Sequence, residues 1–132
     1  MLNDEQHLST ETGVRAKTVL LVEDDLDIGK FLLRTIGEET SFHALLATDA
    51  FEAFHLIHEI APNLFLLDYQ LPRMNGIELY DQLHRTKGLE DIPAIMISAR
   101  LPKQDIEKRS IVGMNKPFDL SELLETIEKL LA

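Results

Sequence analysis

The chain has 132 residues, of which 45% are hydrophobic and 27% are charged, so its length and composition predict one globular domain rather than a disordered or repetitive protein. The 23 Asp and Glu residues outnumber the 13 Lys and Arg residues and give a formal net charge of −10, which would repel nucleic-acid phosphates and anionic lipid surfaces. The absence of cysteine excludes disulfides and thiolate chemistry and agrees with a cytoplasmic location.

Residues 1–16 form a polar N-terminal segment without the apolar stretch of a signal peptide, so we expect a disordered leader outside the fold. The predicted domain covers residues 17–132. Its charge-free runs are far shorter than the roughly 20 apolar residues of a membrane helix, so we expect no membrane span and no membrane partner.

From Lys17 onward, short apolar runs alternate with longer stretches of helical period, a pattern typical of a parallel α/β sheet. Three of the runs are almost entirely apolar, as strands buried on both faces should be. The predicted strands cover residues 18–22, 42–46, 64–67, 94–97 and 111–114. The predicted order is β-α-β-α-β-α-β-(short α)-β-α, with no internal repeat and no second domain.

Apolar residues at helical spacing predict the helices between these strands. A third helix is expected from about Ile77 to Arg85. We expect the apolar stripes that contain Phe31, Phe54 and Leu124 to lie in the core. The residues that mark the first, second and last helices are Ile28, Phe31, Leu32 and Ile36; Ala53, Phe54 and Ile57; and Leu120, Leu123, Leu124, Ile127, Leu130 and Leu131.

Two acidic pairs indicate where helices begin. Asp49 and Glu52 precede the second helix, and Asp119 and Glu122 precede the last. Both pairs have the three-residue spacing of a capping box, in which each side chain bonds the backbone N–H of the other residue.

The interval between the fourth and fifth strands is short. It contains only the twelve residues from Ala99 to Ser110, whereas an average helix of about 11 residues with two connections of about 2–6 residues would need more. We therefore expect the fourth helix to be shortened or irregular.

Polar residues follow the predicted strands at the edge where an open parallel α/β sheet binds ligands. Carboxylates gathered there repel one another, so we expect a cation, and with oxygen ligands the natural choice is Mg²⁺. Such a metal with a lysine and a hydroxyl suits a phosphoryl group, which the remaining carboxylate would attack in line. The residues at these strand ends are Glu23, Asp24, Asp25, Asp68, Ser98 and Lys116.

Four segments, each at a strand end, resemble the motifs of receiver domains of two-component response regulators. They are Val-Leu-Leu-Val-Glu-Asp-Asp at 19–25, Leu-Asp-Tyr-Gln-Leu-Pro-Arg-Met-Asn-Gly at 67–76, Met-Ile-Ser-Ala at 96–99 and Asn-Lys-Pro-Phe at 115–118. The resemblance covers about residues 17–132. It implies a flavodoxin-like, doubly wound sheet of five parallel strands, (βα)5, and a signalling module that catalyses only its own phosphorylation and dephosphorylation.

The resemblance also implies roles for the site residues and a cis bond between Lys116 and Pro117. The implied phospho-acceptor is Asp68, the residue that contacts the phosphoryl group is Lys116, and the switch hydroxyl is that of Ser98. The implied ligands of Mg²⁺ are Asp24, Asp25, Asp68 and the backbone carbonyl of Gln70. Taken alone, Asp24 or Asp25 could instead cap the first helix.

The implied partners are a sensor histidine kinase or phosphotransfer protein as donor and an unknown downstream protein that reads the changed surface, with no nucleic acid. We expect a cytoplasmic monomer or weak dimer. Because the sequence ends at Ala132, directly after the last predicted helix, we expect no output domain in it; it is either a stand-alone receiver or a fragment of a larger regulator.

One position departs from the family pattern. Receivers usually carry an aromatic switch residue three places before the active-site lysine, and here that residue is Gly113. No Phe, Tyr or Trp occurs between Ser98 and Phe118. We hypothesise that residues 101–110 respond to phosphorylation by shifting as a loop.

Two other functions compete with this interpretation. A pseudo-receiver would bind partners without phosphorylation, and the missing aromatic favours it, although the acidic residues, the acceptor and the lysine are all present. A haloacid-dehalogenase-like phosphatase would need a second Asp two residues after its nucleophile, where this chain has Gln70.

Overall fold

A single sheet of five parallel strands forms the centre of the molecule, with strand order β2-β1-β3-β4-β5. The computed structural model describes residues 16–132, so the predicted leader lies, except for its last residue, outside the described residues. The predicted strands are confirmed to within one or two residues at each end. Their bounds are β1 Thr18–Val22, β2 His43–Ala47, β3 Leu64–Asp68, β4 Ala94–Ser98 and β5 Val112–Asn115.

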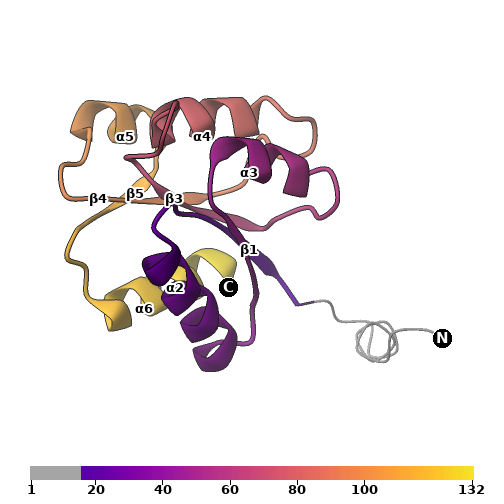
Figure 1. Cartoon of the computed structure of the whole chain (residues 1–132), viewed down its shortest axis with the longest axis vertical. Helices are drawn as coiled ribbons and strands as arrows, with labels where there is room; N and C mark the ends of the chain where they lie inside the picture. Colours follow the sequence, from indigo (N-terminus) through magenta and orange to yellow (C-terminus); the bar gives the residue numbers. More distant parts are fainter. Residues whose placement is uncertain (1–15) are drawn as a thin grey trace.

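Helices cover both faces of the sheet (Figure 1), which gives the predicted doubly wound (βα)5 architecture. Within β1, Val19 and Leu21 face the core shared with α2 and α6, whereas Leu20 and Val22 face the core shared with α3, α4 and α5. This two-sided burial explains why the central strands are apolar throughout. The helix bounds are α2 Leu26–Glu39, α3 Ala50–Leu56, α4 Gly76–His84, α5 Lys103–Arg109 and α6 Leu120–Leu131.

The fourth connection is short, as predicted, but regular. It forms a seven-residue α-helix, α5, between β4 and β5. Within residues 16–132, no helix has the length and apolarity needed to cross a membrane.

The two predicted capping boxes are half formed. Asp49 and Asp119 each accept a hydrogen bond from the backbone N–H three residues later. The Glu52 carboxylate instead accepts from the backbone N–H of Thr48 at 2.6 Å and from its hydroxyl at 3.1 Å. A complete capping box opens α4, where Asn75 and Glu78 bond each other's backbone N–H.

The prediction that Phe31 belongs to the core is wrong, because 52% of its surface is exposed. The buried stripe of α2 consists of Gly29, Leu32 and Ile36. Phe31 precedes Leu32 by one residue and therefore lies about 100° away from it around the helix. Phe54 and Leu124, by contrast, pack against the two cores as expected.

The two ends of the described domain meet at the amino edge of the sheet. The Lys17 ammonium group, just before β1, donates a hydrogen bond of 2.6 Å to the backbone carbonyl of Leu131 at the end of α6. The carboxyl ends of the strands lie at the opposite edge, where the polar residues singled out above gather.

Candidate functional site

A lysine lies between two buried carboxylates at the carboxyl edge of the sheet. The Lys116 Nζ atom, just after β5, is 3.5 Å from Asp68 Oδ2 and 3.7 Å from Glu23 Oε1. Asp68 is the last residue of β3 and is 6% exposed, while Glu23 directly follows β1 and is 3% exposed. The topology therefore brings three strand ends together around one cation.

Three carboxylates form a cluster that could hold a metal ion. One oxygen from each of Glu23, Asp24 and Asp68 lies within 4.8 Å of the other two. The nearby Lys116 supplies one positive charge against up to three negative charges. An all-oxygen donor set of this size fits Mg²⁺, which needs only a few carboxylates and retains several waters.

Asp25, a predicted metal ligand, is not part of this cluster. Its Oδ1 atom accepts hydrogen bonds from the backbone N–H groups of Asp27 at 3.0 Å and Ile28 at 3.1 Å, so Asp25 caps α2. Glu23, rather than Asp25, is the residue that lies with Asp24 and Asp68. The signal that could have distinguished them is the preference of Asp for the residue just before a helix, once α2 is known to start at Leu26.

Glu23 is the carboxyl group whose protonation is most affected by the site. Burial is the main cause that raises the pKa of Glu23 from 4.5 to about 7. The hydrogen bond from the Asp25 N–H lowers this pKa, whereas the charge of Asp68 and hydrogen bonding with Asp68 raise it further. The positive charge of Lys116 lowers it. In the absence of a metal, Glu23 thus exchanges its proton near neutral pH.

The Asp68 carboxylate is held by contacts to both of its oxygens. Oδ1 accepts a hydrogen bond of 3.2 Å from the backbone N–H of Gln70, and Oδ2 faces Lys116. The proposed metal contact of the Gln70 carbonyl remains a prediction.

Gly76, which the sequence analysis did not single out as a site residue, brings α4 against this loop. Its N–H donates to the Tyr69 carbonyl at 2.8 Å, and a Cβ atom there would lie 2.7 Å from the Asp68 carbonyl oxygen. No side chain fits at this position, so glycine is required for the close approach of α4 to the end of β3.

Ser98 ends β4 at the same edge, but its hydroxyl is bonded within its own loop. The Oγ atom accepts from the backbone N–H of Arg100 at 3.0 Å and lies 3.1 Å from the Arg100 carbonyl, to which it donates. Ser98 is 1% exposed, and its carbonyl accepts from the N–H of Lys116 at 2.9 Å. The bond between Lys116 and Pro117 is cis, as the resemblance implied.

Aliphatic side chains occupy the space next to Gly113, where receivers usually have an aromatic residue. A Cβ atom on Gly113 would lie 3.0 Å from Leu101 Cδ1 and 3.2 Å from Ile106 Cδ1. Leu101 comes from the loop after Ser98 and Ile106 from α5, so both belong to the segment expected to respond to phosphorylation.

Comparison with known protein families supports this description. The family "Response regulator receiver domain" matches residues 19–128. The chain is 31% identical over 119 residues to "Polar-differentiation response regulator DivK" of Brucella ovis, an alignment that covers 87% of this chain and 96% of DivK. It is also 31% identical over 118 residues to "Probable transcriptional regulator ycf29" of Pyropia yezoensis, covering 86% of this chain but only 53% of ycf29; the chain thus spans about half of that relative.

Solved structures share the fold. Chemotaxis protein CheY4 of Vibrio cholerae matches with a TM-score of 0.80 and 22% identity, covering 88% of this chain and 99% of CheY4. The receiver domain of the Francisella response regulator 1452 matches with a TM-score of 0.73 and 29% identity, covering 86% of this chain and 95% of that domain.

Proposed function

Because this chain belongs to the family of response regulator receiver domains, we propose that it accepts a phosphoryl group on Asp68 in a Mg²⁺-dependent step. Receiver domains are signalling modules rather than classical enzymes, and they interact with histidine kinases or phosphotransfer proteins and with downstream targets. The observation that carries the proposal is the buried Asp68 carboxylate, 3.5 Å from Lys116 and clustered with Glu23 and Asp24.

The proposed transfer makes one bond and breaks one. A carboxylate oxygen of Asp68 attacks the phosphorus of a phosphohistidine on the donor protein; the new O–P bond forms as the P–N bond breaks, and the histidine nitrogen leaves with the bonding electrons. Lys116 interacts with the phosphoryl oxygens. A bound Mg²⁺ would neutralise negative charge on the transferring group.

The residues proposed to hold Mg²⁺ are Glu23, Asp24 and Asp68, with the backbone carbonyl of Gln70. Asp25 is left out because its carboxylate already accepts two hydrogen bonds from the first turn of α2. We place the protein in the cytoplasm, as a monomer or weak dimer, with a histidine kinase or phosphotransfer protein as donor.

Intact mass after incubation with acetyl phosphate and Mg²⁺ tests the acceptor. We expect a gain of one phosphoryl group that is absent from Asp68→Asn and strongly reduced in Asp24→Asn. Asp25→Asn is the matched control, because Asn caps helices as well as Asp does, and it should be phosphorylated like the wild type. A chain that gains no phosphoryl group from any donor would instead be a pseudo-receiver, the alternative that Gly113 favours.

We further propose that the signal travels from Ser98 into the loop before α5. To donate to a phosphoryl oxygen, the Ser98 hydroxyl must give up its hydrogen bond to the Arg100 carbonyl. Leu101, which follows Arg100, lies against the position that a side chain at residue 113 would occupy. A shift of this loop therefore moves the side chains that fill the place of the usual aromatic residue, and with them the surface of α5.

Amide hydrogen exchange with and without beryllofluoride and Mg²⁺, a mimic of the phosphoryl group, tests this switch. Exchange should change in residues 101–110 of the wild type, and Ser98→Ala should lose most of that change. Asp68→Asn, which cannot hold the mimic, serves as the control. Unchanged exchange in this segment, despite a demonstrated response around Asp68, would rule the switch out.

A further inference from the structure

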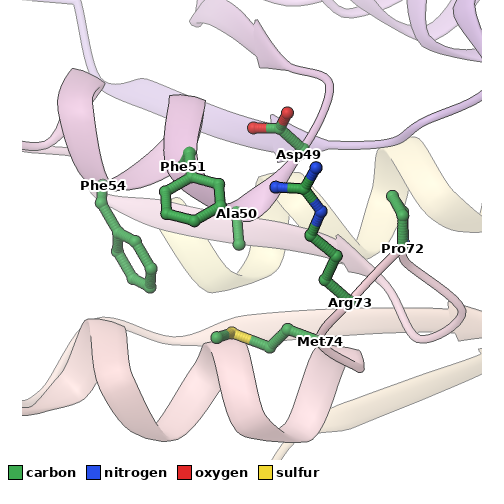
Figure 2. A pocket seen from close by; sticks show the side chains of 7 residues that line it. All are labelled: Asp49, Ala50, Phe51, Phe54, Pro72, Arg73 and Met74. Carbon is green, nitrogen blue, oxygen red and sulfur yellow. The ribbon is translucent and has the colours of Figure 1, made fainter.

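A pocket of about 220 Å³ lies beside α3, outside the phosphorylation site. One wall is the first part of α3, with Phe51 and Phe54, and the other is the loop between β3 and α4, with Met74 (Figure 2). Ala50 and Pro72 complete an apolar interior. Two charged residues, Asp49 and Arg73, stand at its margin.

Phe51 is the most exposed large hydrophobic residue of the described part of the chain, with 64% of its surface accessible. The Arg73 guanidinium carbon lies 5.7 Å from the centre of its ring, a cation–π distance. Phe51 extends the apolar surface of the pocket outward, and covering it would remove a large aromatic face from water.

The pocket margin carries one acidic and one basic side chain, Asp49 and Arg73, and they differ in what they contact. Within residues 16–132, no carboxylate lies within ion-pair distance of Arg73. Asp49 uses its Oδ1 atom to cap α3, where it accepts from the backbone N–H of Glu52, so Arg73 is the charged group of the margin that can pair directly with a carboxylate of a ligand.

We propose that this pocket docks a segment of a partner protein that presents a large apolar side chain next to a carboxylate. The apolar side chain fills the space between Phe54 and Met74, and the carboxylate pairs with the guanidinium of Arg73, which can bind it with two parallel hydrogen bonds. The peptide backbone covers Phe51. We name this surface, formed by Phe51, Phe54, Arg73 and Met74, the α3 pocket.

The α3 pocket shares a loop with the acceptor site. Its residues Arg73 and Met74 follow closely after Gln70, whose backbone N–H donates to Asp68. A partner held there would therefore sit close to the phosphorylation site, yet the binding proposed here requires neither Mg²⁺ nor phosphorylation.

Titration of the ¹⁵N-labelled, unphosphorylated chain with the capped dipeptide acetyl-Phe-Asp-amide tests the proposal by NMR. We expect millimolar binding, with shifts confined to α3 and residues 72–74, and affinity at least about fivefold weaker for acetyl-Phe-Asn-amide, which lacks the charge. Equal affinity for the two peptides, shifts centred elsewhere, or no shifts at all up to about 10 mM peptide would overturn the proposal.

Variants locate the site. Phe51→Ala and Arg73→Gln should each weaken binding of the acidic peptide at least about fivefold, and Arg73→Gln should abolish the preference for Asp over Asn. Phe31→Ala and Arg34→Gln, which remove an exposed Phe and an exposed Arg of α2, are the matched controls and should bind normally.

Asp49→Asn provides a second readout because Asn preserves the helix cap while removing a negative charge. Binding as tight as, or tighter than, that of the wild type supports pairing with Arg73. Binding several-fold weaker would mean that the ligand requires the Asp49 carboxylate and would overturn the proposal.

Discussion

Glu23 is a carboxyl group placed where it serves the site and weakens the fold. Burial raises its pKa from 4.5 to about 7, with a further contribution from Asp68. The folded protein therefore binds this proton more tightly than the unfolded chain does. Stability associated with Glu23 is fully present below pH 4.5 and is lost as the pH rises through about 7.

Replacing Glu23 by Gln should separate stability from metal binding. Gln resembles the protonated carboxyl group. Without Mg²⁺, we therefore expect the free energy of unfolding of Glu23→Gln, measured with urea, to exceed that of the wild type by on the order of 2 kcal/mol above pH 7. The two proteins should differ little below pH 4.5. The same variant should bind Mg²⁺ more weakly. A stability difference that does not change with pH would contradict the assignment of the raised pKa to Glu23.

The sequence located Asp68, Ser98 and Lys116 because each follows an apolar run at the edge where ligands bind. The resemblance implied Asp24 and Asp25 as metal ligands, whereas the structure gathers Glu23 and Asp24 with Asp68. The reason is the start of α2 at Leu26, which makes Asp25 the helix cap, the alternative role that its position also allowed. The acidic run alone does not indicate which of its carboxylates faces the cleft, because that depends on where the helix begins.

At the scale of the elements, α5 depends on its neighbours for stability. A seven-residue helix is marginal by itself, and no side chain caps its N-terminus. Its Arg109 reaches α4, where its guanidinium donates to both oxygens of Asp81 at 2.7 and 2.9 Å. Within α5, the guanidinium also donates to the backbone carbonyl of Asp105 at 3.0 Å and to its carboxylate at 3.3 Å.

Asp81→Asn should loosen α5. The Arg109 hydrogen bonds lower the pKa of Asp81 below 3.8, so the stabilisation is present above pH 3.8 and is lost as the pH falls through the lower folded-state value. Because Asp81 is partly exposed, with 35% of its side chain accessible, we expect a loss of only about 0.5–1 kcal/mol at neutral pH. Amide exchange should accelerate in residues 103–110.

Asp105→Asn is the control for this prediction, because the Asp105 carboxylate is farther from Arg109, at 3.3 Å, and its side chain is 49% exposed. It should change exchange in α5 less than Asp81→Asn does. Equal effects of the two variants, or an effect of Asp81→Asn that persists in acid, would show that the pair with Asp81 is not what holds α5.

The length of the β4–β5 interval predicted a short helix, but not its environment. What fills the space beside Gly113 depends on how the loop folds back, which brings Leu101 and Ile106 together over β5. Such contacts connect residues that are separated along the chain, and a local pattern of apolar residues does not predict them. The link from Arg109 to Asp81, 28 residues away, escaped the sequence analysis for the same reason.

For the molecule as a whole, the alternation of apolar runs and helical stripes was sufficient to predict the fold. Each parallel strand must be covered on both faces, and this requirement leaves few arrangements for five strands and five helices. The same parallel topology places the carboxyl ends of all five strands at one edge of the sheet. Like charges of Glu23, Asp24 and Asp68 are thereby concentrated in the folded state and dispersed in the unfolded chain.

Magnesium should therefore stabilise the whole domain. An ion that binds only the folded state adds about 1.4 kcal/mol when its concentration is ten times its Kd, so we expect the Tm to rise with Mg²⁺ concentration. Asp24→Asn should lose most of this rise in a thermal unfolding assay, whereas Asp25→Asn should keep it. Loss of the effect in Asp25→Asn alone would return Asp25 to the metal site.

The contact between Lys17 and Leu131 has a consequence for how the chain can be rewired. Because it holds the start of β1 beside the end of α6, a short linker could join residue 132 to residue 17, and new termini could be cut in a surface loop without separating the strands. Reporters joined at residues 17 and 132 would emerge together at the amino edge of the sheet. They would leave the Asp68 crevice, at the opposite edge, open to a docking protein.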